Sequence, residues 1–216
     1  MSTILDELSQ AVIKGDAVAV KELTEKALAE GIDPQSIFGD SIIPAMNEVG
    51  RRMETEEYFI PEVLLSCRAV KSASEILKPL ISQGKTVKPE GRVVIGTVQG
   101  DVHDIGKNLV MMMLEGVGFE VIDLGIDVPT ERFVEKVRDA RPDIVAMSAL
   151  LTMTTEKMVE VIQSLSAAGY RENLIIMVGG APVNQEFAVK IGADGFAPDA
   201  GGAARLAKEL LASRSK

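Results

Sequence analysis

The spacing of apolar residues changes near residue 88, where a helical pattern gives way to short apolar runs. Before that position, apolar side chains recur every three or four residues in four stretches, as on the buried face of an amphipathic helix. Gly15-Asp16, Gly31 and Asp33-Pro34 separate the first three stretches, and an Asp-Pro pair is a typical helix start. The pattern predicts a four-helix bundle in residues 1–82. Its apolar faces carry Leu5, Leu8, Val12 and Ile13; Val20, Leu23, Ala27 and Leu28; Ile37, Ile42, Ile43, Met46, Val49 and Met53; and Val63, Leu64, Cys67, Val70, Ile76 and Leu77.

Residues 83–91 are polar and contain two glycines and a proline, which is typical of a linker. We therefore expect two domains, residues 1–88 and 89–216. In the second domain, five short apolar runs alternate with helical patterns, and three of them, Val-Val-Ile, Ile-Val-Ala-Met and Leu-Ile-Ile-Met-Val, are apolar on both faces, as in a parallel sheet covered by helices. This predicts an α/β fold, a flavodoxin-like or Rossmann-like doubly wound sheet whose ligand binds beyond the carboxyl ends of the strands. The predicted strands are Arg92–Val98, Glu120–Leu124, Ile144–Ser148, Leu174–Val178 and Gly195–Ala197, with helices near 105–116, 130–140, 155–168, 184–191 and 201–212.

Charge and composition exclude several classes of function. The formal net charge is −9, and the acidic excess is present in both predicted domains, so we expect no nucleic-acid partner. No apolar run approaches the ~18 residues that a membrane span needs, and the start of the chain lacks the pattern of a secretory signal. We therefore expect a soluble cytoplasmic protein without a membrane partner. The single cysteine, Cys67, excludes an intramolecular disulfide and a multi-thiolate metal site.

The segment Gln99–Asn108 follows the first predicted strand and contains the only histidine of the chain, His103. By itself it could be an ordinary turn in which an aspartate caps the next helix. Imidazole is also a common ligand of transition metals, and a carboxylate on its other nitrogen fixes the tautomer; Asp101 is near enough in sequence for this part. A metal held by one histidine must arrive with most of its ligands in place. A tetrapyrrole-type cofactor meets that condition, and haem stays formally open.

Three short motifs follow the ends of predicted strands: Asp101-x-His103-x-x-Gly106, Ser148-x-Leu150 and Gly179-Gly180. The first motif is a weak pattern by itself, but all three in this order, with 45 residues from His103 to Ser148, are specific. Together they resemble the cobalamin-binding signature shared by methionine synthase, several B12-dependent mutases and the corrinoid proteins of anaerobic methyltransferase systems.

The resemblance implies a cobalamin cofactor, as methylcobalamin, cob(I)alamin or a related corrinoid, bound base-off/His-on. His103 would replace the dimethylbenzimidazole as lower cobalt ligand, Asp101 would accept a hydrogen bond from its far nitrogen, and Thr154 would complete a His–Asp–hydroxyl relay. A threonine at this last position is a conservative departure that adds a methyl group. The implied cofactor-binding residues are Gly100, Asp101, Val102, His103, Asp104, Ile105, Gly106, Ser148, Leu150, Thr152, Gly179, Gly180, Asp199 and Ala200.

The displaced nucleotide tail would run beside the first helix of the second domain. Gly106 and Gly179-Gly180 would leave room for it, and Ser148 and Thr152 would offer hydroxyl groups. Each of these residues also has a structural reading. Ser148 and Thr152 could cap the helix that begins near Thr155, and Gly179-Gly180 could form a tight turn.

The stretch Gly50–Leu65 resembles the helical cap of methyl-carrying corrinoid proteins, in which the bundle covers the upper cobalt face until a partner displaces it. Met46, Val49, Met53, Tyr58 and Phe59 are candidates to face the cofactor, or they form the core of the bundle.

The resemblance makes the chain a non-catalytic corrinoid subunit that carries a methyl group between partners. These would be a substrate-specific methyltransferase, a second methyltransferase with a thiol or tetrahydrofolate acceptor, and a reductive activation protein. The donor could be methanol, a methylamine, a betaine or a methoxylated aromatic. Two alternatives are a cobalamin sensor or storage module, and a flavodoxin-like domain that binds no corrinoid.

Overall fold

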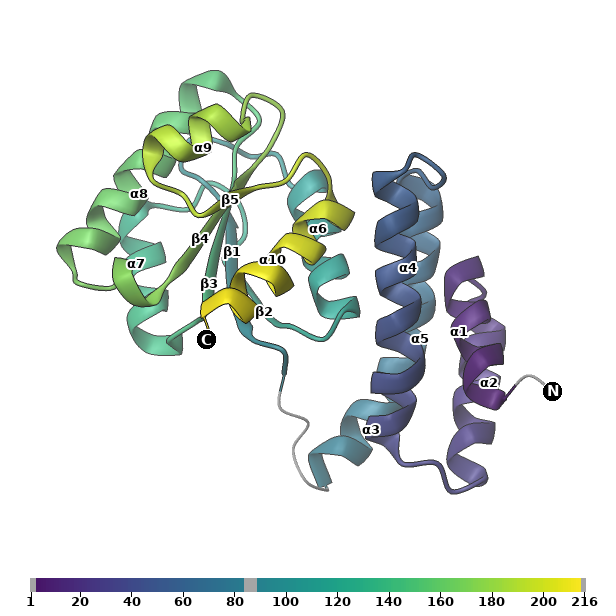
Figure 1. The fold of residues 1–216 in the computed structure, drawn as a ribbon. Coiled ribbons are helices and arrows are strands. Elements are labelled where there is room, and N and C mark those ends of the chain that lie inside the picture. The colour runs from purple at the N-terminus through teal and green to yellow at the C-terminus, as the bar shows by residue number, and fades with distance from the viewer. Residues whose placement is uncertain (1–2, 84–88, 215–216) are drawn as a thin grey trace. The chain divides into compact units, whose positions relative to one another are not determined.

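A computed structural model describes residues 3–83 and 89–214 of the chain (Figure 1). Residue contacts divide the chain into two compact units that adjoin in sequence at Pro89. The first unit is helical and the second is a sheet flanked by helices (Figure 1). The predicted linker, 83–91, falls mainly on residues 84–88, which lie outside the described residues, and Gln83 still belongs to a helix. In the described ranges, no helix has both the length and the apolar character that a bilayer crossing requires.

The first unit is a four-helix bundle, as the apolar pattern predicts. Asp16 and Asp33 cap the second and third helices, since their carboxylates accept backbone N–H groups of the first helical turn. Gly15 ends the first helix in the left-handed conformation that glycine adopts without strain. Ser66 of the last helix and Tyr58, in the turn before that helix, both donate hydrogen bonds to the carbonyl of Ile13 in the first helix. The helices are α1 (Ile4–Lys14), α2 (Ala17–Ala29), α3 (Pro34–Ile37) with the π-helical turn η1 (Phe38–Ile42) and α4 (Ile43–Glu54), and α5 (Ile60–Gln83).

The third helix contains a π-helical turn that the sequence pattern does not predict. α3, η1 and α4 follow one another without a break, and Pro44 lies in the first turn of α4. Proline has no N–H group and its ring crowds the preceding turn, so a wider turn before it keeps the helix continuous. Of the five candidates for facing a cofactor, Met46 and Val49 are buried, Met53 and Tyr58 are half-buried, and Phe59 is exposed. Their roles stay predictions.

The second unit is a five-stranded parallel sheet in the order β2-β1-β3-β4-β5, which confirms the predicted doubly wound α/β fold. The order reverses between β1 and β3, so the crevice for a ligand lies at the carboxyl ends of these two strands. The strands are β1 (Arg92–Thr97), β2 (Glu120–Asp123), β3 (Ile144–Ser148), β4 (Ile175–Gly179) and β5 (Gly195–Phe196). The helices are α6 (Ile105–Gly116), α7 (Thr130–Ala140), α8 (Thr155–Ala167), α9 (Gln185–Ile191) and α10 (Ala200–Arg214), with 3₁₀ turns η2 (Thr152–Thr154) and η3 (Arg171–Asn173).

The core of this unit explains why the strands read as unbroken apolar runs. Val94, Val145 and Ile176 are fully buried in a cluster with Phe133 of α7 and Met158 of α8. The predicted strands lie within one residue of the observed ones. Burial on both faces therefore explains the apolar sequences of the central strands β1, β3 and β4, and polar groups for binding are found in the loops at the strand ends.

The helical unit contains an ion-pair network that makes a pH-dependent contribution to its stability. Glu48 accepts hydrogen bonds from Arg51 (Nε to Oε2, 2.8 Å) and Arg52 (Nε to Oε1, 2.7 Å). These bonds lower the pKa of Glu48 from 4.5 to about 2. Because the folded-state pKa is the lower one, the stabilisation is complete above about pH 4.5 and is lost as the pH falls toward 2.

We therefore expect Glu48→Gln to lower the thermal unfolding midpoint at pH 7, with the difference from the natural chain shrinking between pH 4.5 and 2. Protonated glutamic acid and glutamine make similar hydrogen bonds, so the two chains converge in acid. Circular dichroism melts across this range measure the effect, and Glu22→Gln, an exposed position of α2, is the control. A difference that stays constant with pH would contradict the ion-pair explanation.

Candidate functional site

The motifs singled out in the sequence begin at neighbouring strand ends. Thr97, Ser148 and Gly179 are the last residues of β1, β3 and β4 and lie side by side in register. The loop that carries His103 therefore leaves the sheet beside the loops that follow β3 and β4. Thr97 is fully buried, and its hydroxyl donates a hydrogen bond to the carbonyl oxygen of His103 (2.8 Å). The strand end thus fixes the backbone of the histidine.

A buried carboxylate, Asp101, joins the first two loops. Its Oδ1 accepts hydrogen bonds from the ring Nδ1 of His103 (2.7 Å) and from the backbone N–H of the same residue (3.1 Å). Its Oδ2 accepts three more, from the Thr154 hydroxyl (2.8 Å) and from the backbone N–H groups of Leu150 (2.8 Å) and Leu151 (3.2 Å). The structure therefore brings His103, Asp101 and Thr154 into the arrangement that the resemblance implies.

The environment of Asp101 determines the state of the histidine ring. Burial alone would raise the pKa of Asp101, but the hydrogen bonds from His103, Leu150 and Thr154 outweigh it and hold the pKa well below its usual range. The carboxylate is therefore ionised and can only accept, so Nδ1 of His103 carries the proton. When this is the only proton on the ring, Nε2 has a free lone pair. With 46% of the side chain exposed, this nitrogen can bind a metal.

Thr154 fits its place as a threonine. It forms the N-cap of α8, and its hydroxyl also lies 2.8 Å from the carbonyl oxygen of Leu151. Its methyl carbon would be 3.6 Å from a Cβ on Gly100, an ordinary contact distance. Neither Ser148 nor Thr152 is at the N-cap position of α8, and Thr154, which is, makes no capping hydrogen bond with its side chain because its hydroxyl faces Asp101.

Gly180 allows the loops after β3 and β4 to approach closely. Its φ is +118°, and a Cβ at this position would lie 1.8 Å from the carbonyl oxygen of Ala149, which no side chain permits. Its own carbonyl accepts the N–H of Val183 (3.0 Å), so the expected turn is also present. A Cβ on Gly106, in the first turn of α6, would meet no atom within 4 Å, which leaves open space beside the His103 loop.

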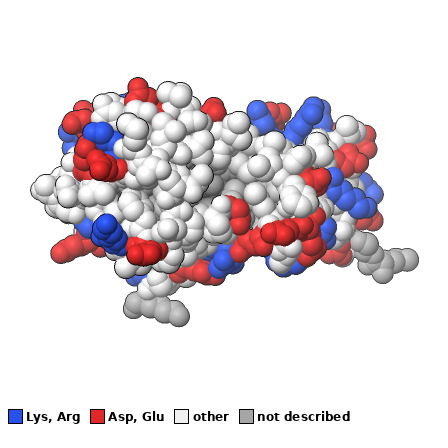
Figure 2. Space-filling model, turned by 90° about the horizontal axis from the view of Figure 1, so that it is seen from above, with Lys and Arg blue, Asp and Glu red and all other residues white. Residues whose placement is uncertain are grey.

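The remaining predicted residues are divided between the centre and the far side of this sheet end. Val102 and Ile105 are exposed apolar side chains within two residues of His103 in the chain. Leu150 is a third exposed apolar side chain, and its backbone N–H donates to the same carboxylate, Asp101, as His103. In a view toward the carboxyl ends of the strands, the surface of the sheet unit is largely uncharged (Figure 2). Asp199 and Ala200 follow β5. Three strand spacings separate β5 from β1, which is roughly 14 Å at the usual distance between neighbouring strands. Asp199 caps α10 by accepting the N–H of Gly202 (2.8 Å).

Sequence reasoning missed Asp127, in the loop between β2 and α7. Its carboxylate accepts the N–H of Gly100 (2.7 Å), and its own N–H donates to the carbonyl of Asp101 (2.9 Å). Its φ is +50°, a left-handed conformation that aspartate tolerates better than most residues. Its place in the sequence gave no signal of this role. It holds the histidine loop from the side of β2.

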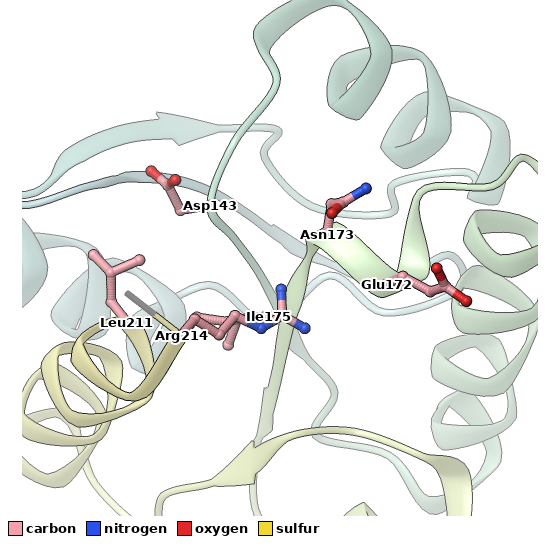
Figure 3. Close-up of a pocket in the computed structure, with 6 residues that line it drawn as sticks. All are labelled: Asp143, Glu172, Asn173, Ile175, Leu211 and Arg214. Carbon is pink, nitrogen blue, oxygen red and sulfur yellow. The ribbon is translucent and has the colours of Figure 1, made fainter. Parts of the chain in front are cut away.

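A hollow of about 380 Å³ lies at the opposite end of the sheet (Figure 3). Asp143 and Ile175 mark the amino ends of β3 and β4, and the Asp143 carboxylate accepts the backbone N–H of Arg92 (2.7 Å). None of the predicted site residues contributes to it. The lining residues are Asp143, Glu172, Asn173, Ile175, Leu211 and Arg214.

Comparison with known sequence families decides the identity of both units. A family described as "B12 binding domain" matches residues 91–206, and a second family of the same description matches residues 4–78. The chain belongs to the B12-binding corrinoid proteins. The site of this corrinoid protein fits its family's cofactor, since a ring that brings its own equatorial nitrogens needs one axial donor and an apolar surface to lie on.

Known corrinoid proteins match nearly the whole chain. Dimethylamine corrinoid protein 1 of Methanosarcina acetivorans is 44% identical over 97% of this chain and 98% of its own length. Trimethylamine corrinoid protein 1 of the same organism is 42% identical over 88% of this chain and 89% of its own length. A cobalamin-binding protein of Desulfitobacterium hafniense has a similar structure, with a TM-score of 0.81, 34% identity and coverage of 95% and 97%. The methanol:cobalamin methyltransferase complex MtaBC of Methanosarcina barkeri is also similar, with a TM-score of 0.85 and 31% sequence identity. The match covers 97% of this chain and 80% of the matched chain.

We expect Thr154→Val to lower the free energy of unfolding by about 1–3 kcal/mol, because it removes one donor from a buried carboxylate without changing side-chain size. Thr154→Ser keeps the donor and loses one methyl group, so its cost is about 0.8 kcal/mol. Denaturant unfolding of the apoprotein measures both. An equal loss in the two variants would show that the methyl group, and not the hydroxyl, matters at this position.

Proposed function

We propose that this corrinoid protein binds its cofactor base-off/His-on, with His103 as the lower cobalt ligand, and carries a methyl group between two methyltransferases. The observation that supports this most directly is the buried, ionised Asp101, which leaves Nε2 of the exposed His103 ring free to bind. When bound, the corrinoid supplies a cobalt centre that accepts and releases the methyl group.

The chain's own residues have defined tasks in this proposal. His103 holds the cofactor from below, and Asp101 keeps the proton on Nδ1 and increases the basicity of the ring. Nε2 would hold the metal, and a ring that is not bound to metal could carry a proton there while Nδ1 stays hydrogen-bonded to Asp101. Thr154 keeps the carboxylate in place in both states. We place the nucleotide tail beside Gly106, with Ser148, Thr152 and Gly179-Gly180 along its path.

Partner enzymes would provide the rest of the reaction. The relatives named dimethylamine and trimethylamine corrinoid proteins favour a methylamine methyltransferase as the substrate-specific partner. A second methyltransferase would pass the methyl group to a thiol or a tetrahydrofolate, and a reductive activation protein would restore the reduced cofactor. The chain would then act as a subunit without a complete active site.

The histidine ligand can be tested without mutation, because His103 is the only histidine. We expect the electron paramagnetic resonance spectrum of the cob(II)alamin holoprotein to show a nitrogen triplet that becomes a doublet after ¹⁵N-histidine labelling. His103→Ala should retain some corrinoid in the tail slot and lose this splitting. A triplet that labelling does not change would mean that the cofactor keeps its own base, and the proposed binding mode would be wrong.

Methyl transfer distinguishes a carrier from a sensor or storage module. We expect the reduced holoprotein to be methylated rapidly by a methylamine with its methyltransferase, more slowly or not at all with methanol, betaine or methoxyaromatic systems. The ultraviolet–visible spectrum of the cofactor follows the reaction. A protein that binds cobalamin tightly but accepts no methyl group from any of these systems would support the sensor or storage alternative.

A further inference from the structure

Lys107 places a charged group in the interior of the sheet unit, where the proposed function does not use it. It lies in the first turn of α6, and only 1% of its side chain is exposed. Its Nζ donates hydrogen bonds to Asp123 Oδ1 (2.7 Å) and to Asn108 Oδ1 (2.8 Å). A buried ion pair contributes little net stability compared with an apolar pair of the same size, but it constrains geometry. This contrast suggests that Lys107 serves to position its neighbours.

One branch of hydrogen bonds leads from this pair to the backbone of His103. Asp123, at the end of β2, also accepts the N–H of Gly125 (2.9 Å) through the same Oδ1. The carbonyl of Gly125 accepts the N–H of Thr97 (3.0 Å), and the Thr97 hydroxyl donates to the carbonyl of His103. A continuous series of hydrogen bonds thus links Asp123, at the end of β2, to the backbone of His103 through Thr97 at the end of β1.

A second branch reaches the residue that follows the histidine. Asn108, which accepts from Lys107, donates through its side-chain amide to Asp104 Oδ2 (3.1 Å). Its backbone N–H donates to the carbonyl of Asp104 (2.7 Å). The two branches therefore hold the backbone on the carbonyl side of His103 and at Asp104, while Asp101 holds the ring and the backbone N–H of His103.

We propose that Lys107, paired with Asp123, is a positioning residue that fixes the backbone of the His103 loop and so determines how strongly Nε2 binds the cobalt. This inference rests on the proposed His-on binding mode. A metal ligand must be held within about half an ångström of its productive position, and outer partners of ligands change metal affinity by about 10- to 100-fold. Lys107 touches neither the ring nor the cofactor, so its effect is indirect.

Lys107→Met tests this role, since methionine fills a similar space without a charge. Asp123 has a 36% exposed side chain, so water can solvate its carboxylate once the ammonium group is gone, and the variant should fold. The matched control is Lys157→Met. Lys157 forms an ion pair of the same length with Glu160 (2.7 Å) on the surface of α8 in the same unit, with 36% and 48% of the side chains exposed.

Two measurements separate positioning from general stability. In the apoprotein of Lys107→Met, we expect amide hydrogen exchange of residues 101–105 to be about tenfold faster than in Lys157→Met, with similar exchange in β3 and β4. In the ¹⁵N-histidine-labelled cob(II)alamin form, we expect a smaller fraction with the nitrogen doublet and about tenfold weaker cobalamin binding.

A labelled wild-type holoprotein without the nitrogen doublet would refute the proposed binding mode. Amide hydrogen exchange of residues 101–105 in the apoprotein would still test whether Lys107 positions the loop, because it does not depend on the cofactor. A wild-type doublet together with equal exchange, doublet fraction and affinity in Lys107→Met and Lys157→Met would overturn the role of Lys107. If Lys107→Met does not fold, Asp123→Ala cuts the first branch and Asn108→Ala cuts the second, and values equal to the control in both variants would overturn the inference equally.

Discussion

The site depends on keeping one carboxylate ionised out of contact with water. Removing a charge from water is costly unless hydrogen bonds replace the lost hydration, and five donors surround Asp101. Two of them come from His103 and three from the segment that follows β3. The same set of bonds thus balances the charge, joins the ends of two adjacent strands and selects the tautomer of the imidazole. Each of these effects requires the other two.

The architecture could be predicted from the sequence because buried faces of helices and strands carry apolar residues at regular spacings. Apolar residues at helical spacing marked the bundle, and short runs that are apolar on both faces, alternating with helical patterns, marked the central strands of a parallel sheet covered by helices. Asp101 and His103 could be paired from their spacing after the first strand, whereas Thr154 was joined to them only through the resemblance to the cobalamin-binding signature. The structure places them within hydrogen-bond distance, and their roles toward the cofactor stay predictions.

What the sequence could not show depends on distance along the chain and on the backbone. The N–H groups of Leu150 and Leu151 have no side-chain signature, although they supply two of the five donors to Asp101. The partner of Lys107 is 16 positions away, at the end of a strand whose neighbour was not known in advance. The π-helical turn before Pro44 depends on how the whole third helix continues, and an apolar pattern does not record it.

The spacing of the Asp101 network also sets an order of events in the life of the protein. Thr154 lies 53 residues after the carboxylate that it supports. A nascent chain that has emerged only as far as α6 already contains the imidazole and its carboxylate, but it lacks the three donors after β3 that replace the hydration of Asp101. The buried, ionised form of Asp101 must therefore wait until β3 and the segment that follows it have been synthesised and have docked, so assembly of the site follows pairing of β1 with β3.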